Sequence, residues 1–291
     1  MGIVQRKLSR SFKAFFDSEK SSGILLIVCT AVSLISANSI LGENYLSIWR
    51  NYIGRLSVEH WINDGLMAIF FLLIGLELKR ELYNGELSNF KNALLPIFAA
   101  AGGIILPALI HFVLNTGSST QAGIGIPMAT DIAFALGALA ILGNRVPASL
   151  KVFVVAFAVI DDLVAIVVIA VFYTAELSAL YLIGALLVLA LLAAAARFFV
   201  ITSLVVYLLA GALVWFLMLK SGVHATIAGV LLAFAIPSSE MEDDEESPSY
   251  QLENLLHMPV AFVILPIFAL CNTGIVIGAI VTGRDVESLA L

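Results

Sequence analysis

Long apolar segments constrain the fold of this chain more than any other feature. A helix that crosses a lipid bilayer needs about 20 predominantly apolar residues. Nine segments meet or approach this length, at residues 22–41, 61–79, 93–115, 121–142, 150–173, 177–196, 201–219, 222–237 and 258–281. The sequence therefore predicts an all-α membrane protein, a polytopic helical bundle in which residues 1–291 form a single transmembrane domain.

The composition agrees with a lipid environment. Hydrophobic residues make up 61% of the chain and charged residues 12%, against about 45–50% and about 25% in soluble domains. The net charge of −6 is concentrated in one place, because six of the 21 acidic residues lie between Glu240 and Glu246. No basic patch is available for nucleic acid, so we expect the lipid bilayer as a partner and no nucleic acid.

The distribution of Lys and Arg predicts the orientation of the chain in the membrane. With the N-terminus in the cytoplasm, 11 of the 15 basic residues fall on the cytoplasmic side, which is the side that Lys and Arg prefer. In this orientation residues 238–257 form an acidic cytoplasmic loop.

Two adjacent carboxylates, Asp161 and Asp162, lie near the middle of the fifth segment. An ionisable group at that depth costs at least about 2.5 kcal/mol, which makes it a functional candidate by default. Successive helix positions point about 100° apart, so the two side chains cannot face each other. At least one must face a cavity or a partner; the alternative is a structural salt bridge.

The fourth segment contains Gly123, Gly125 and Pro127 shortly before Thr130 and Asp131. Proline removes a backbone donor and disfavours helical geometry in the preceding residue. We therefore expect an interrupted helix, which is typical of the binding sites of transporters. A simple proline kink is the alternative.

Together these side chains offer oxygen ligands, which hard cations prefer. The sequence predicts sodium at Asp161 and Asp162, with Thr130 and Asp131 nearby. The same carboxylates bind protons, so proton and cation would compete for one site. Competition of this kind, at a site that faces each side in turn, is an exchange mechanism that needs no cofactor and no catalytic nucleophile.

Weaker candidates lie at the ends of segments. Glu77 precedes the basic pair at the end of the second segment, where a solvated helix end is the alternative interpretation. His224 and His257 lie near the membrane interfaces and would usually be solvated there, although histidine is the natural pH-sensitive side chain.

Several motifs resemble those of the NhaA-type sodium/proton antiporters. They follow one another in family order over nearly the whole chain: WINDGLMA at 61–68, FLLIGLELKRE at 71–81, ATDIAFALG at 129–137, IDDL at 160–163, KSGVHAT at 220–226 and LPIFALCN at 265–272.

This resemblance implies a twelve-helix, multi-pass protein of the bacterial inner membrane that exchanges sodium or lithium ions for protons. The ion and proton site of the family corresponds to Asp161 and Asp162, and the residues of its interrupted fourth helix to Thr130 and Asp131. The family's pH-response region corresponds to Glu77 and Glu253, with His257 nearby. Asn254 stands where relatives often have histidine. The resemblance also leaves open whether the protein forms a homodimer.

The sequence ends at Leu291, after the ninth segment. In the family a tenth helix brings a lysine to the aspartates, and an eleventh is the second interrupted helix. We therefore expect a chain shortened at its C-terminus, with the second repeat missing and without exchange activity by itself. The competing interpretations are an inactive remnant or membrane subunit, and an intramembrane enzyme, for which no Gly-x-Gly-Asp or Asp-Asp-x-x-Asp motif is found.

Overall fold

The computed structural model describes most of the apolar segments, namely residues 21–83, 88, 90–128, 139, 145–147, 150, 153–154, 156–158, 160–161, 164, 168, 177–199, 203–238 and 247–277. Within these residues the regular structure is helical, apart from one antiparallel pair of two-residue strands, β1 (Tyr52–Ile53) and β2 (Leu56–Ser57). The prediction of an all-α membrane protein is confirmed.

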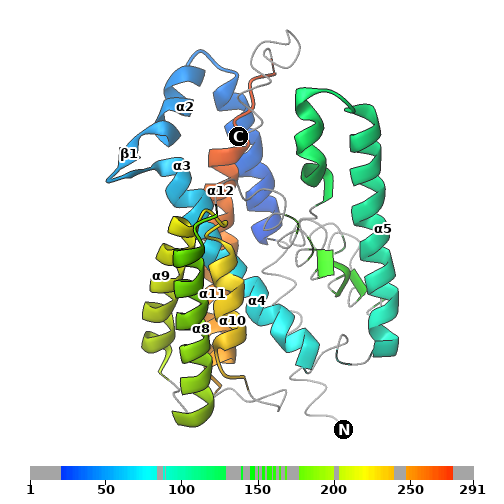
Figure 1. The fold of residues 1–291 in the computed structure, drawn as a ribbon. Helices are drawn as coiled ribbons and strands as arrows, with labels where there is room; N and C mark the ends of the chain where they lie inside the picture. Colours follow the sequence, from blue (N-terminus) through cyan, green and yellow to red (C-terminus); the bar gives the residue numbers. More distant parts are fainter. Residues whose placement is uncertain are drawn as a thin grey trace.

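The first half of the described chain runs from a helix at Ser21–Ala37 to the region around residue 128 (Figure 1). The first helix turns by 115° into α2, Gly42–Arg50. After the strands, three consecutive helical pieces form one long segment: α3 (Val58–His60), the π-helix η1 (Trp61–Leu66) and α4 (Met67–Tyr83). They are followed by α5 (Phe90–Leu114) and the 3-10 helix η3 (Ser119–Met128).

The second half contains α8 (Ala179–Phe199), α9 (Leu204–Ser221) and the short α10 (Ile227–Ala235). A second long segment then joins α11 (Pro248–Pro259), the π-helix η5 (Val260–Ile264) and α12 (Leu265–Asn272). Ser247 begins this segment by accepting a hydrogen bond from the Tyr250 N–H, and Pro248 occupies the first turn. Both residues favour a helix start at this position.

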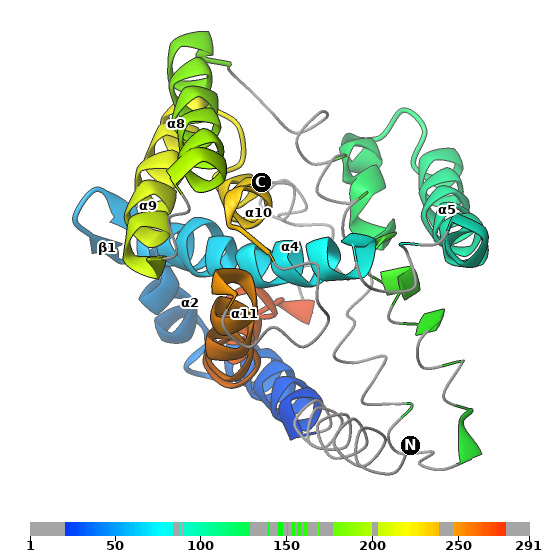
Figure 2. The same ribbon diagram turned by 90° about the horizontal axis from the view of Figure 1, so that it is seen from below.

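Helix α4 lies at the centre of the described structure. Figure 2 shows α10 on one side of α4 and α11 on the other, while α8 and α9 pack against each other beyond α10. Buried apolar side chains join α4, α8, α9, α10 and α11 in one core cluster, which includes Leu76, Tyr207, Val214 and Leu232. The C-terminal end of α4 is therefore held between two other helices.

Five helices in the described residues are long and apolar enough to cross a membrane: Val58–Tyr83, Ala93–Leu114, Ala179–Phe198, Leu204–Ser221 and Pro248–Asn272. A sixth results if the bent pair Ser21–Ala37 and Gly42–Arg50 is one span. The segments expected at 93–115, 177–196 and 201–219 correspond closely to α5, α8 and α9.

Clear differences from the expected boundaries lie in the first, eighth and ninth segments. The first segment was expected to continue to residue 41, but its helix ends at Ala37 because the chain turns there. A Cβ on Gly42 would lie 2.3 Å from the Ala37 carbonyl oxygen, so this turn requires glycine. The ninth segment begins at Pro248, ten residues before the predicted start and inside the expected loop 238–257.

In the eighth segment, expected at 222–237, the helix is limited to the nine residues of α10. A helix of this length is about 14 Å long, which is shorter than the bilayer core of about 30 Å. Gly222, with a positive φ of 82°, ends α9, and Ile236 is extended at the end of α10, where Pro237 follows.

The described part of the fourth segment is irregular. Residues Ser119–Met128 form a 3-10 helix, and Gly123 leaves helical geometry with φ −74° and ψ 15°. Over this part the structure agrees with the predicted interruption. Residues 129–138 lie outside the described residues.

Candidate functional site

Asp161 is a buried carboxylate in the fifth segment, with 1% of its surface exposed. Its helical neighbour Ile160 packs, together with Phe157 and Val164, against Ala100 and Ile104 of α5. A charged carboxylate at a buried position costs free energy unless a partner compensates it. Asp161 is therefore suited to hold either a proton or a cation.

The other residues predicted for the ion site, Asp162, Thr130 and Asp131, lie outside the described residues. Among the side chains that the structure does describe, no group of three His, Cys, Asp or Glu residues is close enough to hold a metal ion. The predicted sodium site thus remains a prediction, of which the structure shows the buried carboxylate of Asp161.

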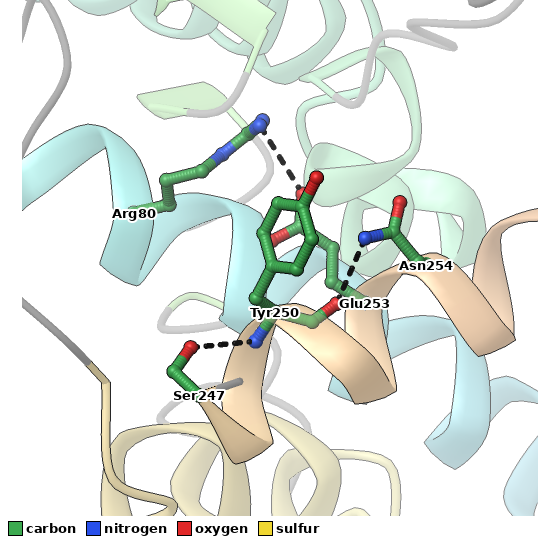
Figure 3. A network of polar contacts seen from close by, with 5 residues as sticks. All are labelled: Arg80, Ser247, Tyr250, Glu253 and Asn254. Atoms are coloured by element: carbon green, nitrogen blue, oxygen red, sulfur yellow. Dashed lines mark hydrogen bonds and ion pairs between the residues drawn. The ribbon is translucent and has the colours of Figure 1, made fainter. Parts of the chain in front are cut away.

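A second polar site lies at the C-terminal end of α4. Arg80 of α4 forms an ion pair with Glu253 of α11, with 3.4 Å between guanidinium nitrogen and carboxylate oxygen. Figure 3 shows this pair above the first turns of α11, where Asn254 donates to the Tyr250 carbonyl over 3.1 Å. The Arg80 side chain is 48% exposed and that of Glu253 14% exposed. The pair therefore connects a largely buried carboxylate to a solvated cation.

The four candidate pH-response residues fall into two places. Glu77 lies one helical turn before Arg80, and His257 one turn after Glu253, so three of the four belong to the ends of α4 and α11. His224 lies at the opposite end of α10, where its carbonyl oxygen accepts from the Ile227 N–H over 3.2 Å. The structure brings Glu253 to α4 but leaves His224 apart from that site.

Sequence reasoning missed two polar contacts. Lys79, treated as part of a charged helix end, is buried and donates to backbone carbonyls of α10. Asn63 of η1 and Asn272 of α12 form a reciprocal pair of amide hydrogen bonds of 3.1 and 2.8 Å. Backbone acceptors leave no mark in a sequence, and single asparagines 209 positions apart carry no pairing signal.

The helices and buried polar groups described so far define a multi-pass, all-α membrane protein. Its sequence matches the family model "Na+/H+ antiporter 1" over residues 13–290. The chain belongs to this family.

Individual relatives agree with that assignment. The chain is 68% identical to the Na(+)/H(+) antiporter NhaA of Dechloromonas aromatica over 279 residues, which cover 96% of this chain and 72% of the relative. It is 54% identical to the NhaA antiporter of Flavobacterium psychrophilum, with 98% and 73% covered. The NhaA antiporter of Mesorhizobium japonicum is 50% identical, with 99% and 73% covered.

Proposed function

We propose that this chain is a secondary active transporter that exchanges sodium ions for protons across the bacterial inner membrane. The observation that carries the proposal is the buried carboxylate of Asp161 in an apolar segment of a chain that belongs to the Na+/H+ antiporter 1 family. The names of its relatives support sodium and protons as the exchanged species.

In this proposal Asp161 and Asp162 bind sodium and the proton in turn, and Thr130 and Asp131 of the irregular fourth segment contribute to the site. The physical support is the chemistry of the side chains. Carboxylate and hydroxyl oxygens suit hard cations, and a carboxylate that has lost its water binds either a cation or a proton to neutralise its charge. No cofactor takes part in the exchange.

We further propose that the ends of α4 and α11 regulate the exchange by pH. The Arg80–Glu253 ion pair supports this role, because protonation of Glu253 would remove the attraction that joins the two helices there. Glu77 and His257 lie within one turn of this pair, and His224 would act separately at the far end of α10. We also propose that the chain transports lithium as a second ion, that its N-terminus lies in the cytoplasm and that it forms a homodimer.

Everted membrane vesicles from cells without their own sodium/proton antiporters provide the test. A pH-sensitive dye reports proton movement when sodium is added between about pH 6.5 and 8.5. We expect sodium to dissipate the pH gradient in vesicles that contain the chain, and this outcome would reject the alternative, raised in the sequence analysis, of a chain without exchange activity by itself. In the variant Asp162→Asn the rate should fall about 10- to 100-fold, since a charge-assisted ligand contributes about 1.5–3 kcal/mol.

Glu43→Gln is the matched control. Glu43 lies in the first turn of α2, where its side chain is exposed, and it belongs to neither the proposed ion site nor the proposed pH-response residues. The control should exchange sodium as the parent chain does. Absence of sodium-dependent proton movement in the parent chain would reject the function, and normal exchange by Asp162→Asn would reject the site.

A further inference from the structure

Lys79 is the one basic side chain that is buried among the described residues, with 6% of its surface exposed. Its ammonium group donates to the carbonyl oxygen of Phe234 over 3.3 Å and also to that of Ile236. Both acceptors belong to the last turn and the end of α10. The buried ammonium group on α4 is therefore stabilised by hydrogen bonds to the backbone of another helix.

The end of α10 needs such a donor. The last carbonyl groups of a helix have no intrahelical partner and carry a partial negative charge. Ile236 is extended, as expected for the residue that precedes Pro237, so the helix cannot continue. Basic side chains satisfy carbonyls at this position, usually from the same helix; here Lys79 reaches them from α4.

Close packing of the two helices brings Lys79 to this position. A Cβ on Gly75, one turn before Lys79, would lie 2.7 Å from the Ala233 Cβ and 3.0 Å from the Val230 Cα. The helices therefore approach each other at backbone distance along this face. The long Lys79 side chain emerges where the packed face ends, directly over the terminal carbonyls of α10.

The next residue, Arg80, points to a different helix. Consecutive helical side chains diverge by about 100°, and Arg80 pairs with Glu253 of α11 on the other side of α4; Figure 2 shows this arrangement of the three helices. The ends of α10 and α11 are themselves joined, because the Ser249 N–H donates to the Pro237 carbonyl over 3.3 Å. The contacts of Lys79, Arg80 and Ser249 thus close a ring through three helices.

We infer that Lys79 is a positioning residue: its ammonium caps α10 and so fixes the end of α4 from which Arg80 reaches Glu253. The inference rests on the proposed function, because the Arg80–Glu253 pair belongs to the proposed pH response. Lys79 itself acts through the helix ends and touches no transported ion.

Among the described residues, three charged side chains act on Glu253, so the effect of losing one of them should be measurable. Arg80 and Glu81 act on it from α4 and His257 from its own helix, and α10 has no titratable side chain. If Lys79 no longer holds α10, Arg80 loses its fixed place beside Glu253. The carboxylate is then less strongly held in its charged form, and the exchange should require a higher pH.

Three substitutions at position 79 test this inference in everted vesicles. Lys79→Met removes the donor and the charge, and the midpoint of the exchange–pH profile should rise by about half a pH unit or more. Lys79→Arg keeps both and should restore the parent profile. Lys79→Gln keeps a hydrogen-bond donor without the charge, so it should shift the midpoint by an intermediate amount. It also serves as a second variant if Lys79→Met does not accumulate in the membrane.

A double substitution separates positioning from a general loss of stability. In a Glu253→Gln background, Lys79→Met should cause no further shift of the midpoint, because the group through which Lys79 acts is gone. An unshifted midpoint in both Lys79→Met and Lys79→Gln, or the same shift in the Glu253→Gln background, would overturn the inference.

A distance measurement keeps the test independent of transport. Spin labels at the exposed positions Leu82 of α4 and Phe234 of α10 report the separation of the two helix ends. We expect a narrow distance distribution in the parent chain and in Lys79→Arg, and a broadened one in Lys79→Met. Absence of sodium exchange in the parent chain would reject the proposed function. An unchanged distance distribution in Lys79→Met would overturn the positioning role of Lys79, whether or not the parent chain transports sodium.

Discussion

Gly229 allows α10 to contact the backbone of α4. A Cβ at this position would lie 2.1 Å from the Ala68 carbonyl oxygen and 2.7 Å from the Leu72 nitrogen. Both are backbone atoms, so neither can rotate away to make room. A methyl group at residue 229 must therefore push the two helices apart.

We predict that Gly229→Ala destabilises the protein by about 1–3 kcal/mol, the usual cost of forcing additional atoms into a packed interface. The thermal unfolding midpoint of the detergent-solubilised protein should fall accordingly. Gly102→Ala in α5 is the control, because no described atom beyond the neighbouring backbone of its own helix lies within 4 Å of the added Cβ. There the midpoint should stay the same or rise, since alanine favours a helix by up to about 1 kcal/mol over glycine. Equal midpoints for the two variants would contradict the packing argument.

At the scale of single elements, the start of α11 depends on the hydroxyl group of Ser247. Its oxygen accepts from the Tyr250 N–H over 3.3 Å, and the side chain is buried. We predict that Ser247→Ala costs about 1 kcal/mol, the typical contribution of an N-cap. The measurement is the unfolding midpoint in detergent, together with protection of the first turn of α11 from hydrogen exchange.

Ser203 provides the matched control for this prediction. It stands at the same N-cap position of α9, but its side chain accepts no capping hydrogen bond from the first turn of this helix. Ser203→Ala should therefore leave the midpoint nearly unchanged. A loss as large as that of Ser247→Ala would show that the effect does not come from capping.

The length of an apolar segment predicts some elements of this chain and not others. It identified α5, α8 and α9, because these helices are uniformly apolar over about the thickness of a bilayer. It missed α2, whose Glu43 and Arg50 make it amphipathic, and the first turns of α11, which are polar. The cap signal of Ser247 and Pro248 is visible in the sequence, but a search for apolar length does not use it.

Some residues of the candidate sites can likewise be identified from the sequence, and others cannot. The sequence singles out Asp161 and Asp162, because two adjacent ionisable residues inside an apolar segment have no inexpensive structural explanation, while their role in ion binding stays a prediction. The buried position of Lys79 was not predictable, because its acceptors are backbone carbonyls at the end of α10. Only the packing of α4 against α10 brings these groups together, and one sequence without pairing information does not contain it.

Across the whole molecule, the beginning and the end of the described chain are tied by polar side chains. Figure 1 shows the first helix beside α12. Ser33, which is fully buried in this helix, donates to the Leu270 carbonyl of α12 over 2.9 Å. Asn38 donates to the Ile275 carbonyl over 2.8 Å and accepts from the Ile277 N–H over 2.9 Å. These contacts fix the N-terminal helix to residues more than 230 positions away.

Tyr45 of α2 completes this connection. Its hydroxyl oxygen lies 2.5 Å from the Leu270 carbonyl oxygen and 2.9 Å from the Ser33 hydroxyl oxygen. Three oxygens thus share two hydroxyl hydrogens, so the loss of either hydroxyl group changes the bonding of the other. The turn of the chain between the first helix and α2 is what allows both hydroxyl groups to reach α12.

We predict that Tyr45→Phe and Ser33→Ala each cost about 0.5–1.5 kcal/mol, and that their effects are not additive. The coupling should be at least about 0.5 kcal/mol, as for residues that share one hydrogen-bond network. A double-mutant cycle on the unfolding midpoint measures it. Tyr52→Phe is the control, because Tyr52 in β1 is 76% exposed, and its substitution should change neither the midpoint nor the effect of Ser33→Ala. Strict additivity of Tyr45→Phe and Ser33→Ala would show that the two hydroxyl groups bond to α12 independently and form no shared network.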